Sequence, residues 1–134
     1  MVWYGLKGIV LNIWFALAAA LAFIVCLMHV IMGGREAARP LLAASELDQV
    51  AKFTNYYCWH LVTIAIAAVG AAFFIAARDP DAYVLGVFAV AMAASFAAWS
   101  LIMIVRFRLP PLPFGQWILF LAVAGVGGAG LIAA

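Results

Sequence analysis

Charged residues are scarce in this sequence. Only 9% of its 134 residues are charged and 71% are hydrophobic, whereas a soluble domain is about one quarter charged and about half apolar. A net charge of +2 without any basic run is too small to indicate nucleic-acid binding, so we expect no nucleic-acid partner. We therefore predict an integral membrane protein whose surroundings are the lipid bilayer.

Cysteine and the motifs of common enzymes are also nearly absent. The two cysteines, Cys26 and Cys58, lie in or beside apolar runs, so a disulfide scaffold is not indicated. No GxSxG, HExxH or phosphate-binding glycine loop is present. These absences favour a non-catalytic role, although they leave enzymatic activity open.

What the sequence does contain is long apolar runs. A membrane-spanning helix needs about 20 apolar residues, and backbone groups in lipid must pair within a helix. We predict an all-α, four-helix integral membrane bundle that forms a single domain over residues 1–134. The predicted spans are residues 8–32, 55–77, 82–105 and 115–133.

The segments between the runs carry the turn signals. Gly33 and Gly34 are predicted to end the first helix, because glycine is common at helix C-termini. Apolar residues recur at near-helical spacing after Pro40, which predicts a short amphipathic surface helix between spans one and two. Residues 78–81 predict a tight turn, and three prolines in 106–115 exclude a helix there.

The basic residues predict the orientation. Loops that carry more lysine and arginine face the cytoplasm. Two basic residues, Lys7 and Arg78, lie on one predicted side and five on the other: Arg35, Arg39, Lys52, Arg106 and Arg108. We therefore expect a bacterial inner-membrane protein with loops 33–54 and 106–115 in the cytoplasm and both termini in the periplasm.

The only two histidines, His29 and His60, lie on either side of the first long loop. A rise of about 1.5 Å per residue on antiparallel helices puts them at similar depth near the cytoplasmic face. Ionisable residues inside a membrane suggest a functional site. The structural alternative is that each imidazole bonds a backbone carbonyl and only fixes helix packing.

Three kinds of ligand are compatible with the polar residues around His29 and His60. A b-type haem would use His29 and His60 as axial ligands, with Arg35, Arg39 or Arg106 paired with its propionates. A quinone head group would use a histidine with Thr63, Ser95 or Trp99. A soft metal such as copper would use Cys26 and Met32 with both histidines. The candidate cofactor-binding residues are thus His29, His60, Thr63, Arg35, Arg39 and Trp99, with His29 and His60 as the candidate metal ligands.

Small residues near the C-terminus indicate close helix packing. Ala124 with Gly128 and Gly125 with Ala129 form small-xxx-small pairs. Such a face serves either packing within the bundle or association with another subunit or a second copy.

The pattern His29-x3-Gly33-Gly34, with Pro40-Leu41-Leu42 and Trp59-His60-x2-Thr63, resembles a group of small four-helix bacterial inner-membrane proteins. The resemblance spans the first half of the chain. It implies the four-helix fold and brings no activity with it.

These patterns lead to two functional predictions. The leading one is a small non-catalytic subunit or assembly factor of a larger membrane complex, respiratory or photosynthetic. The alternative is a redox protein that binds b-type haem or quinone through His29 and His60 near the cytoplasmic face.

Overall fold

The computed structural model describes residues 11–134, and all regular structure within that range is helical. Lys7 and the first three residues of the predicted span 8–32 lie outside the described residues. The elements are α1 (Ile13–Met28), the π-helix η1 (His29–Ala38), α2 (Arg39–Ala43), α3 (Gln49–Arg78), the 3-10 helix η2 (Pro80–Ala82), α4 (Tyr83–Phe107) and α5 (Gln116–Ile132). The first three follow one another without a break, so they form one helix that we call the first helix.

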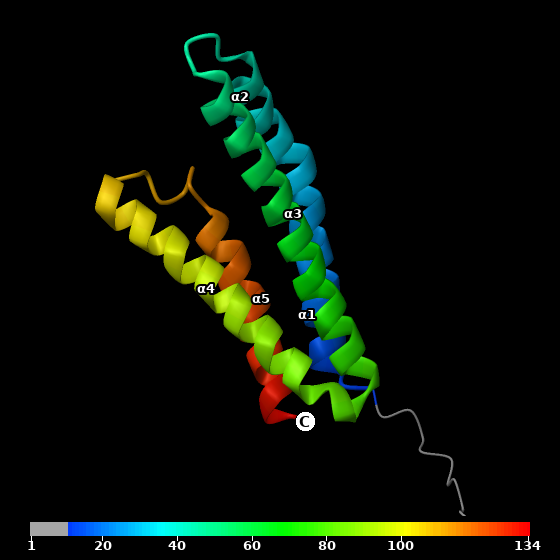
Figure 1. Ribbon diagram of the computed structural model, residues 1–134. Helices are drawn as coiled ribbons and strands as arrows, with labels where there is room; N and C mark the ends of the chain where they lie inside the picture. Colours follow the sequence, from blue (N-terminus) through cyan, green and yellow to red (C-terminus); the bar gives the residue numbers. More distant parts are fainter. Residues whose placement is uncertain (1–10) are drawn as a thin grey trace, which may run out of the picture.

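The helices run up and down and form two hairpins (Figure 1). The first helix pairs with α3, and α4 pairs with α5. The hairpins pack on each other through α1 with α5 and α3 with α4. We call the end that holds loops 44–48 and 108–115 the loop end, and the end that holds η2 and the C-terminus the turn end.

The prediction that Gly33 and Gly34 end the first helix is wrong. The chain continues through them as a π-helix, in which the Arg39 N–H donates to the Gly34 carbonyl. Two glycines cost a helix about 1 kcal/mol each, but the far half of the first helix packs against α3 and buries Ala38 to 5% exposure. Tertiary packing therefore outweighs the local glycine signal.

The separate surface helix between spans one and two is also absent from the described residues. The residues around Pro40 complete the first helix as α2, and the residues from Gln49 onward begin α3. The apolar side chains that suggested a surface helix are divided between the facing ends of two long helices. Only residues 44–48 connect them.

The remaining boundaries agree with the sequence except one, since the predicted range 55–77 begins six residues after the start of α3 (Gln49–Arg78). The predicted ranges 82–105 and 115–133 correspond to α4 and α5, each within two residues at both ends. Helix α4 ends where Arg108 adopts a left-handed backbone with φ of 54°. The proline segment then returns the chain, and the Trp117 indole N–H donates to the Pro111 carbonyl at 3.0 Å.

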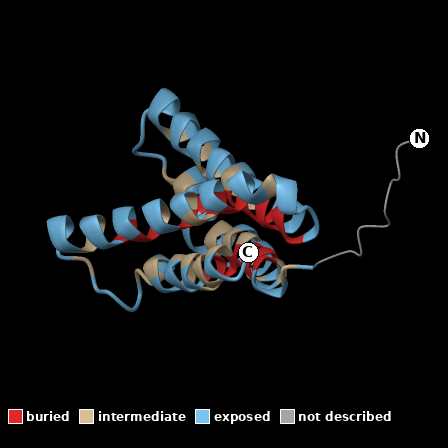
Figure 2. Cartoon of the chain, turned by 90° about the horizontal axis from the view of Figure 1, so that it is seen from below, coloured by how far each residue is buried: buried red, intermediate tan, exposed pale blue. Residues whose placement is uncertain are grey.

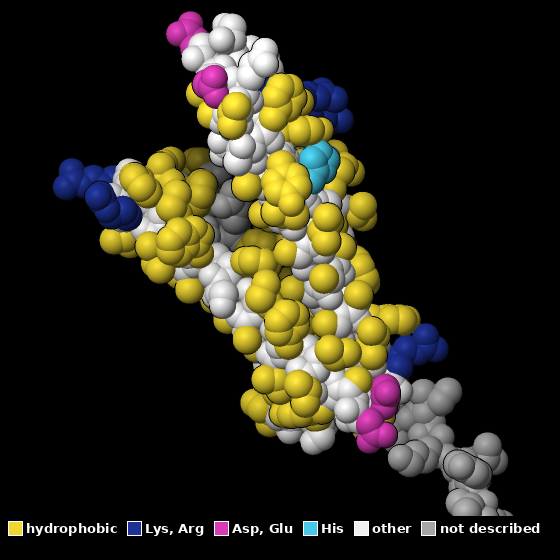
Figure 3. All heavy atoms as spheres, in the orientation of Figure 1, with side chains coloured by type: hydrophobic (Ala, Val, Ile, Leu, Met, Phe, Trp, Pro, Cys, Tyr) yellow, Lys and Arg dark blue, Asp and Glu magenta, His cyan; other side chains and the backbone are white. Residues whose placement is uncertain are grey.

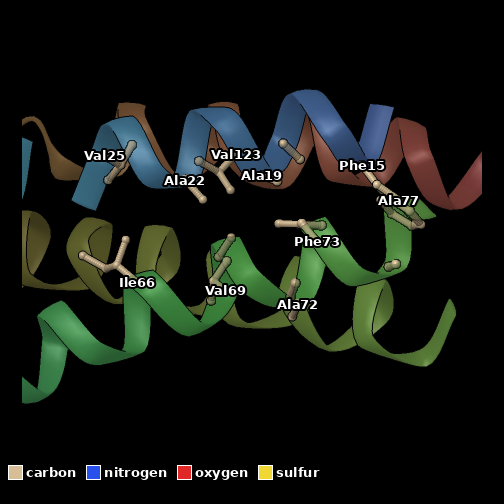
Figure 4. Packing of buried hydrophobic residues seen from close by; sticks show 14 residues of the cluster. Phe15, Ala19, Ala22, Val25, Ile66, Val69, Ala72, Phe73, Ala77 and Val123 are labelled. Carbon is tan, nitrogen blue, oxygen red and sulfur yellow. The ribbon is translucent and has the colours of Figure 1, made fainter. Parts of the chain in front are cut away.

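The core lies in the turn-end half of the bundle. Phe15 and Phe73 are at most 1% exposed, and their ring centroids lie 5.9 Å apart. Glycine makes this possible, because a Cβ at Gly127 would lie 2.5 Å from Phe73 and one at Gly130 would lie 2.5 Å from Phe15. Figure 4 shows the two rings between the helices, and Figure 2 shows the buried residues on the inward faces.

Three helices are long and apolar enough to cross a membrane: the first helix, α3 and the continuous η2–α4 segment. Helix α5 is apolar but has 17 residues. Figure 3 shows charged side chains at the two ends of the molecule and hydrophobic side chains between them. This distribution is compatible with helices that cross a membrane.

Candidate functional site

His29 is fixed by Trp59 across the interface of the first helix and α3. Its Nε2 lies 3.3 Å from the Trp59 carbonyl oxygen. The imidazole and indole rings stack with centroids 4.7 Å apart and an interplanar angle of 22°. Because a carbonyl can only accept, Nε2 carries the proton in this contact and Nδ1 of neutral His29 is an acceptor.

His60 does not face His29. It is exposed, and its ring lies edge-on to Tyr56 at 4.6 Å and to Trp59 at 5.0 Å. Successive residues on a helix differ by about 100° in direction, and Trp59 takes the inward direction. The partner of His29 on α3 is therefore an indole rather than the second imidazole.

This geometry does not fit a haem held by both histidines. The Nε2 of His29 is already used by the Trp59 carbonyl. One turn away, the Cys26 thiol donates to the Thr63 carbonyl at 3.7 Å. The first helix and α3 are thus in direct contact, and a porphyrin has no space between them.

The four-residue soft-metal set is not formed either. Within residues 11–134, no three side chains of His, Cys, Asp or Glu gather closely enough to hold a metal ion. Cys26 therefore does not join both histidines in one site. A site made of His29 and His60 alone stays a prediction.

The other predicted residues are spread over the loop end. The Thr63 hydroxyl donates to the same Trp59 carbonyl, at 3.2 Å, so Thr63 supports the His29 contact. Arg35 and Arg39 are exposed and line a surface hollow beside Trp59. Trp99 is 64% exposed on α4. The structure thus brings Thr63 to His29 and leaves Trp99 on the outer surface.

A groove lies between the two hairpins at the loop end, where Figure 3 shows the molecule hollowed. Its cavity volume is about 400 Å³. His29, Glu36 and Gln116 supply its polar side chains. Its apolar lining comes from both hairpins and includes Met28, Met32, Ile66, Pro113, Leu119 and Phe120. One side of this groove is therefore the first helix at His29 and Gly33.

Sequence reasoning missed Trp59 and the role of Gly33 beside it. A signal for Trp59 was available in the apolar stripe of α3. Ile66 and Phe73, seven residues apart, are both buried, and seven residues before Ile66 is Trp59 rather than His60. Residues seven apart lie on nearly the same side of a helix.

Comparison of the chain with protein-family models, with curated proteins and with solved structures finds no match. The resemblance to small four-helix inner-membrane proteins therefore stays a prediction.

Proposed function

We propose that this protein is a four-span bacterial inner-membrane protein that acts as a non-catalytic subunit or assembly factor of a larger membrane complex. The uncharged part of the first helix, from Ile13 to Gly34, is about 33 Å long at 1.5 Å per residue. This matches a hydrocarbon core of about 30 Å. Helix α5, with 17 uncharged residues, crosses as the fourth span, at the short end of the range for membrane helices, about 17–25 residues.

The same proposal places the loop end in the cytoplasm. Arg35, Arg39, Lys52, Arg106 and Arg108 all belong to the loop end, whereas Arg78 belongs to the turn end. Lysine and arginine are enriched on the cytoplasmic side of inner-membrane proteins. The C-terminus, at the turn end, is then periplasmic.

The observation that carries the proposal is the length of the α1–α3 hairpin. At the loop end it extends beyond the α4–α5 hairpin (Figure 1). Its projecting part presents Val50 at 75% exposure and Phe53 at 57% exposure, close to the charged residues Asp48 and Lys52. In a hairpin tip that projects beyond the bilayer, as this proposal has it, these exposed apolar side chains support a protein contact. The projecting hairpin tip, residues 42–53, is thus the proposed contact with the rest of the complex.

A second surface supports association within the bilayer. Among residues 11–134, a Cβ placed at Gly125 or at Gly128 would meet no other atom within 4 Å. Ala124 packs against the core and Gly127 and Gly130 admit the core phenylalanines, so Gly125 and Gly128 are the small residues of α5 that remain open to a neighbouring helix. Small residues let a neighbouring membrane helix approach closely.

Photo-crosslinking in native membranes tests the proposal. A photoreactive amino acid at Phe53 is expected to give a discrete protein adduct. The same group at Val84, 73% exposed in the turn-end part of α4, is the matched control and should give lipid adducts only. A chain that yields no protein adduct at Phe53 and migrates alone on native gels would contradict a role as a subunit or assembly factor.

A further inference from the structure

A surface hollow at the loop end is lined by two arginines, and we call it the arginine hollow. Arg35 and Arg39 line it from the first helix, and Tyr56 and Trp59 line it from α3. Its volume is about 360 Å³, which lies within the range of small-molecule sites, about 300–1,000 Å³. It is distinct from the groove between the hairpins, which His29 lines.

The arginine hollow is positively charged. Within residues 11–134, its lining contains two guanidinium groups and no carboxylate. The Lys52 ammonium lies beside it, because Nζ donates to the carbonyl of Leu42, another lining residue, at 3.3 Å. The acidic side chains of this end have other places: Glu36 lines the groove between the hairpins, Asp48 caps α3, and Glu46 lies in the connecting loop. The hollow therefore favours an anion.

The donor groups of the arginine hollow suit a phosphate. A guanidinium is always charged and donates two parallel N–H bonds to a pair of phosphate oxygens. Arg35 and Arg39 are four residues apart on one continuous helix, and both line the same hollow. The Tyr56 hydroxyl and the Trp59 indole N–H are uncharged donors of the same lining. Two charged and two neutral donors thus surround one small volume.

The depth of the arginine hollow indicates where the phosphate comes from. The uncharged part of the first helix ends at Gly34, so at 1.5 Å per residue Arg35 and Arg39 lie about 1.5 Å and about 7.5 Å beyond it. The head-group layer on each side of a bilayer is about 5–7 Å thick, because a bilayer of about 40–45 Å has a hydrocarbon core of about 30 Å. Both arginines are therefore at the level of the lipid head groups.

The rest of the lining matches the boundary between head groups and hydrocarbon. Val30 and Ile31 line the hollow on the hydrocarbon side of Gly34, and they are 43% and 51% exposed. The rings of Tyr56 and Trp59 are parallel to within 2°, with centroids 6.2 Å apart. Tyrosine and tryptophan are enriched at this level of the membrane. The hollow thus joins a cationic part to an apolar part, as a phospholipid joins its phosphate to its acyl chains.

We propose that the arginine hollow binds an anionic phospholipid, with its phosphodiester held by Arg35 and Arg39 and the start of an acyl chain against Val30 and Ile31. A zwitterionic lipid binds more weakly, because its ammonium or choline group brings a positive charge close to the two guanidiniums. The inference rests on the membrane-spanning part of the proposed function. It is independent of the scaffold role, which rests on the projecting hairpin tip.

The double variant Arg35→Gln/Arg39→Gln tests the site. Both side chains are exposed, so glutamine removes the charges and leaves the fold unchanged. Arg106→Gln/Arg108→Gln is the matched control, because it removes the same charge from the loop end of the other hairpin, where neither residue lines the hollow. Figure 3 shows that the basic side chains of the loop end form separate groups on the two hairpins.

The measurement is native mass spectrometry of the full chain, freed of lipid in a non-ionic detergent. The probes are dioleoylphosphatidylglycerol and dioleoylphosphatidylcholine. A charge-assisted hydrogen bond changes affinity by about tenfold or more, so the wild type should bind the first phosphatidylglycerol at least about tenfold more tightly than phosphatidylcholine. Arg35→Gln/Arg39→Gln should lose about tenfold or more of the phosphatidylglycerol affinity. The control should stay within about threefold, because charges farther away than about 8 Å are screened at physiological ionic strength.

The single variants Arg35→Gln and Arg39→Gln replace the double variant should it melt below the wild type. Each should lose about threefold or more in phosphatidylglycerol affinity, whereas Arg106→Gln alone should not. Equal affinities for the two lipids, or equal effects of the two double variants, would overturn the proposal.

Free phosphate has the same chemistry as the lipid head group, and a competition arm separates the two sources. Inorganic phosphate at a concentration comparable to that of the lipid should leave phosphatidylglycerol bound. Displacement would assign the hollow to a soluble phosphate and overturn the proposal. Binding of neither lipid would overturn the site together with the membrane placement, whereas equal binding of both overturns the site alone. Crosslinking at Phe53 is unaffected by either result, so failure here is distinguishable from failure of the scaffold role.

Discussion

The two ends of this molecule are built from different kinds of residue. At the turn end, Phe15 and Phe73 fill the centre of the bundle because Gly86, Gly127 and Gly130 leave room for them. At the loop end, the hairpins are separated by a groove that contains His29. Close packing of the core at the turn end holds the two hairpins together. The hairpins can therefore be separated by a groove at the loop end.

The largest expected effect separates two adjacent phenylalanines. Phe73→Ala should destabilise the protein by about 3 kcal/mol or more. Phe73 is fully buried, and the glycine against which it packs has no side chain that could fill the cavity left by the missing ring. Phe74→Ala is the control. Phe74 is 47% exposed and touches Arg78, so its loss should cost under about 1 kcal/mol. Thermal unfolding in the same detergent measures both, and equal melting temperatures would contradict a core at the turn end.

A smaller effect is expected from two adjacent glycines of α5. Gly127→Ala places a methyl 2.5 Å from Phe73 and 2.9 Å from Val90, and such overpacking costs about 1–3 kcal/mol. Gly128→Ala has open space around the new methyl, so stability should change by less than about 0.5 kcal/mol. If Gly128→Ala were the more damaging of the two in isolated monomers, the assigned rotation of α5 would be wrong.

Helix caps allow the same comparison between the two ends. The Asn12 side chain accepts from the N–H groups of Trp14 and Phe15 and donates to the Gly130 carbonyl at 3.0 Å. Asn12→Ala therefore loses a cap and a tie between α1 and α5, at a cost of about 2 kcal/mol.

Asp48 caps α3 at the exposed loop end, through the N–H groups of Val50 and Ala51. Asp48→Ala loses the cap alone, about 1 kcal/mol. Chemical unfolding gives the free energy of unfolding of each variant. The difference between the two losses measures the contribution of the Asn12–Gly130 hydrogen bond between α1 and α5. A larger loss for Asp48→Ala would mean that Asn12 does not connect α1 to α5.

The smallest expected effect concerns stability at the loop end. Gly33→Ala meets only contacts of 3.8 Å and replaces a poor helix former by a good one, which favours the helix by up to about 1 kcal/mol. Its melting temperature should equal or exceed that of the wild type. A clear drop in melting temperature would show that this end is packed as closely as the turn end.

The sequence predicted the parts of the fold whose signals are local. Two chain reversals were predicted from local signals: the prolines between α4 and α5, and the turn at residues 78–81. The helix ends that flank each reversal lie within two residues of their predicted positions. The prediction from Gly33 and Gly34 was wrong because the preference of glycine for helix ends is weaker than the packing of the first helix along α3. No local signal reveals that packing, since it depends on which long helix lies alongside.

The contact between the first helix and α3 beside His29 was predictable, but the depth of His29 and the rotation of α3 were not. The sequence placed His29 near the end of a span that finishes at residue 32, whereas the first helix continues to Ala43. The partner of His29 depends on the rotation of α3, and extending the buried Ile66–Phe73 repeat by seven residues would have reached Trp59. The position of Gly33 beside His29 and Trp59 could not be inferred, because a residue expected to end the helix lies inside it.

The most direct test measures the separation of the hairpins at both ends. Pulsed electron paramagnetic resonance in nanodiscs would use spin labels at two pairs of exposed positions, after replacement of Cys26 and Cys58 by alanine. The Met32–Gln116 pair spans the groove, and the Ile13–Ile132 pair spans the turn end. We predict a longer distance for Met32–Gln116 than for Ile13–Ile132. Equal distances, or a shorter one across the groove, would contradict a bundle that is closed at the turn end and open at the loop end.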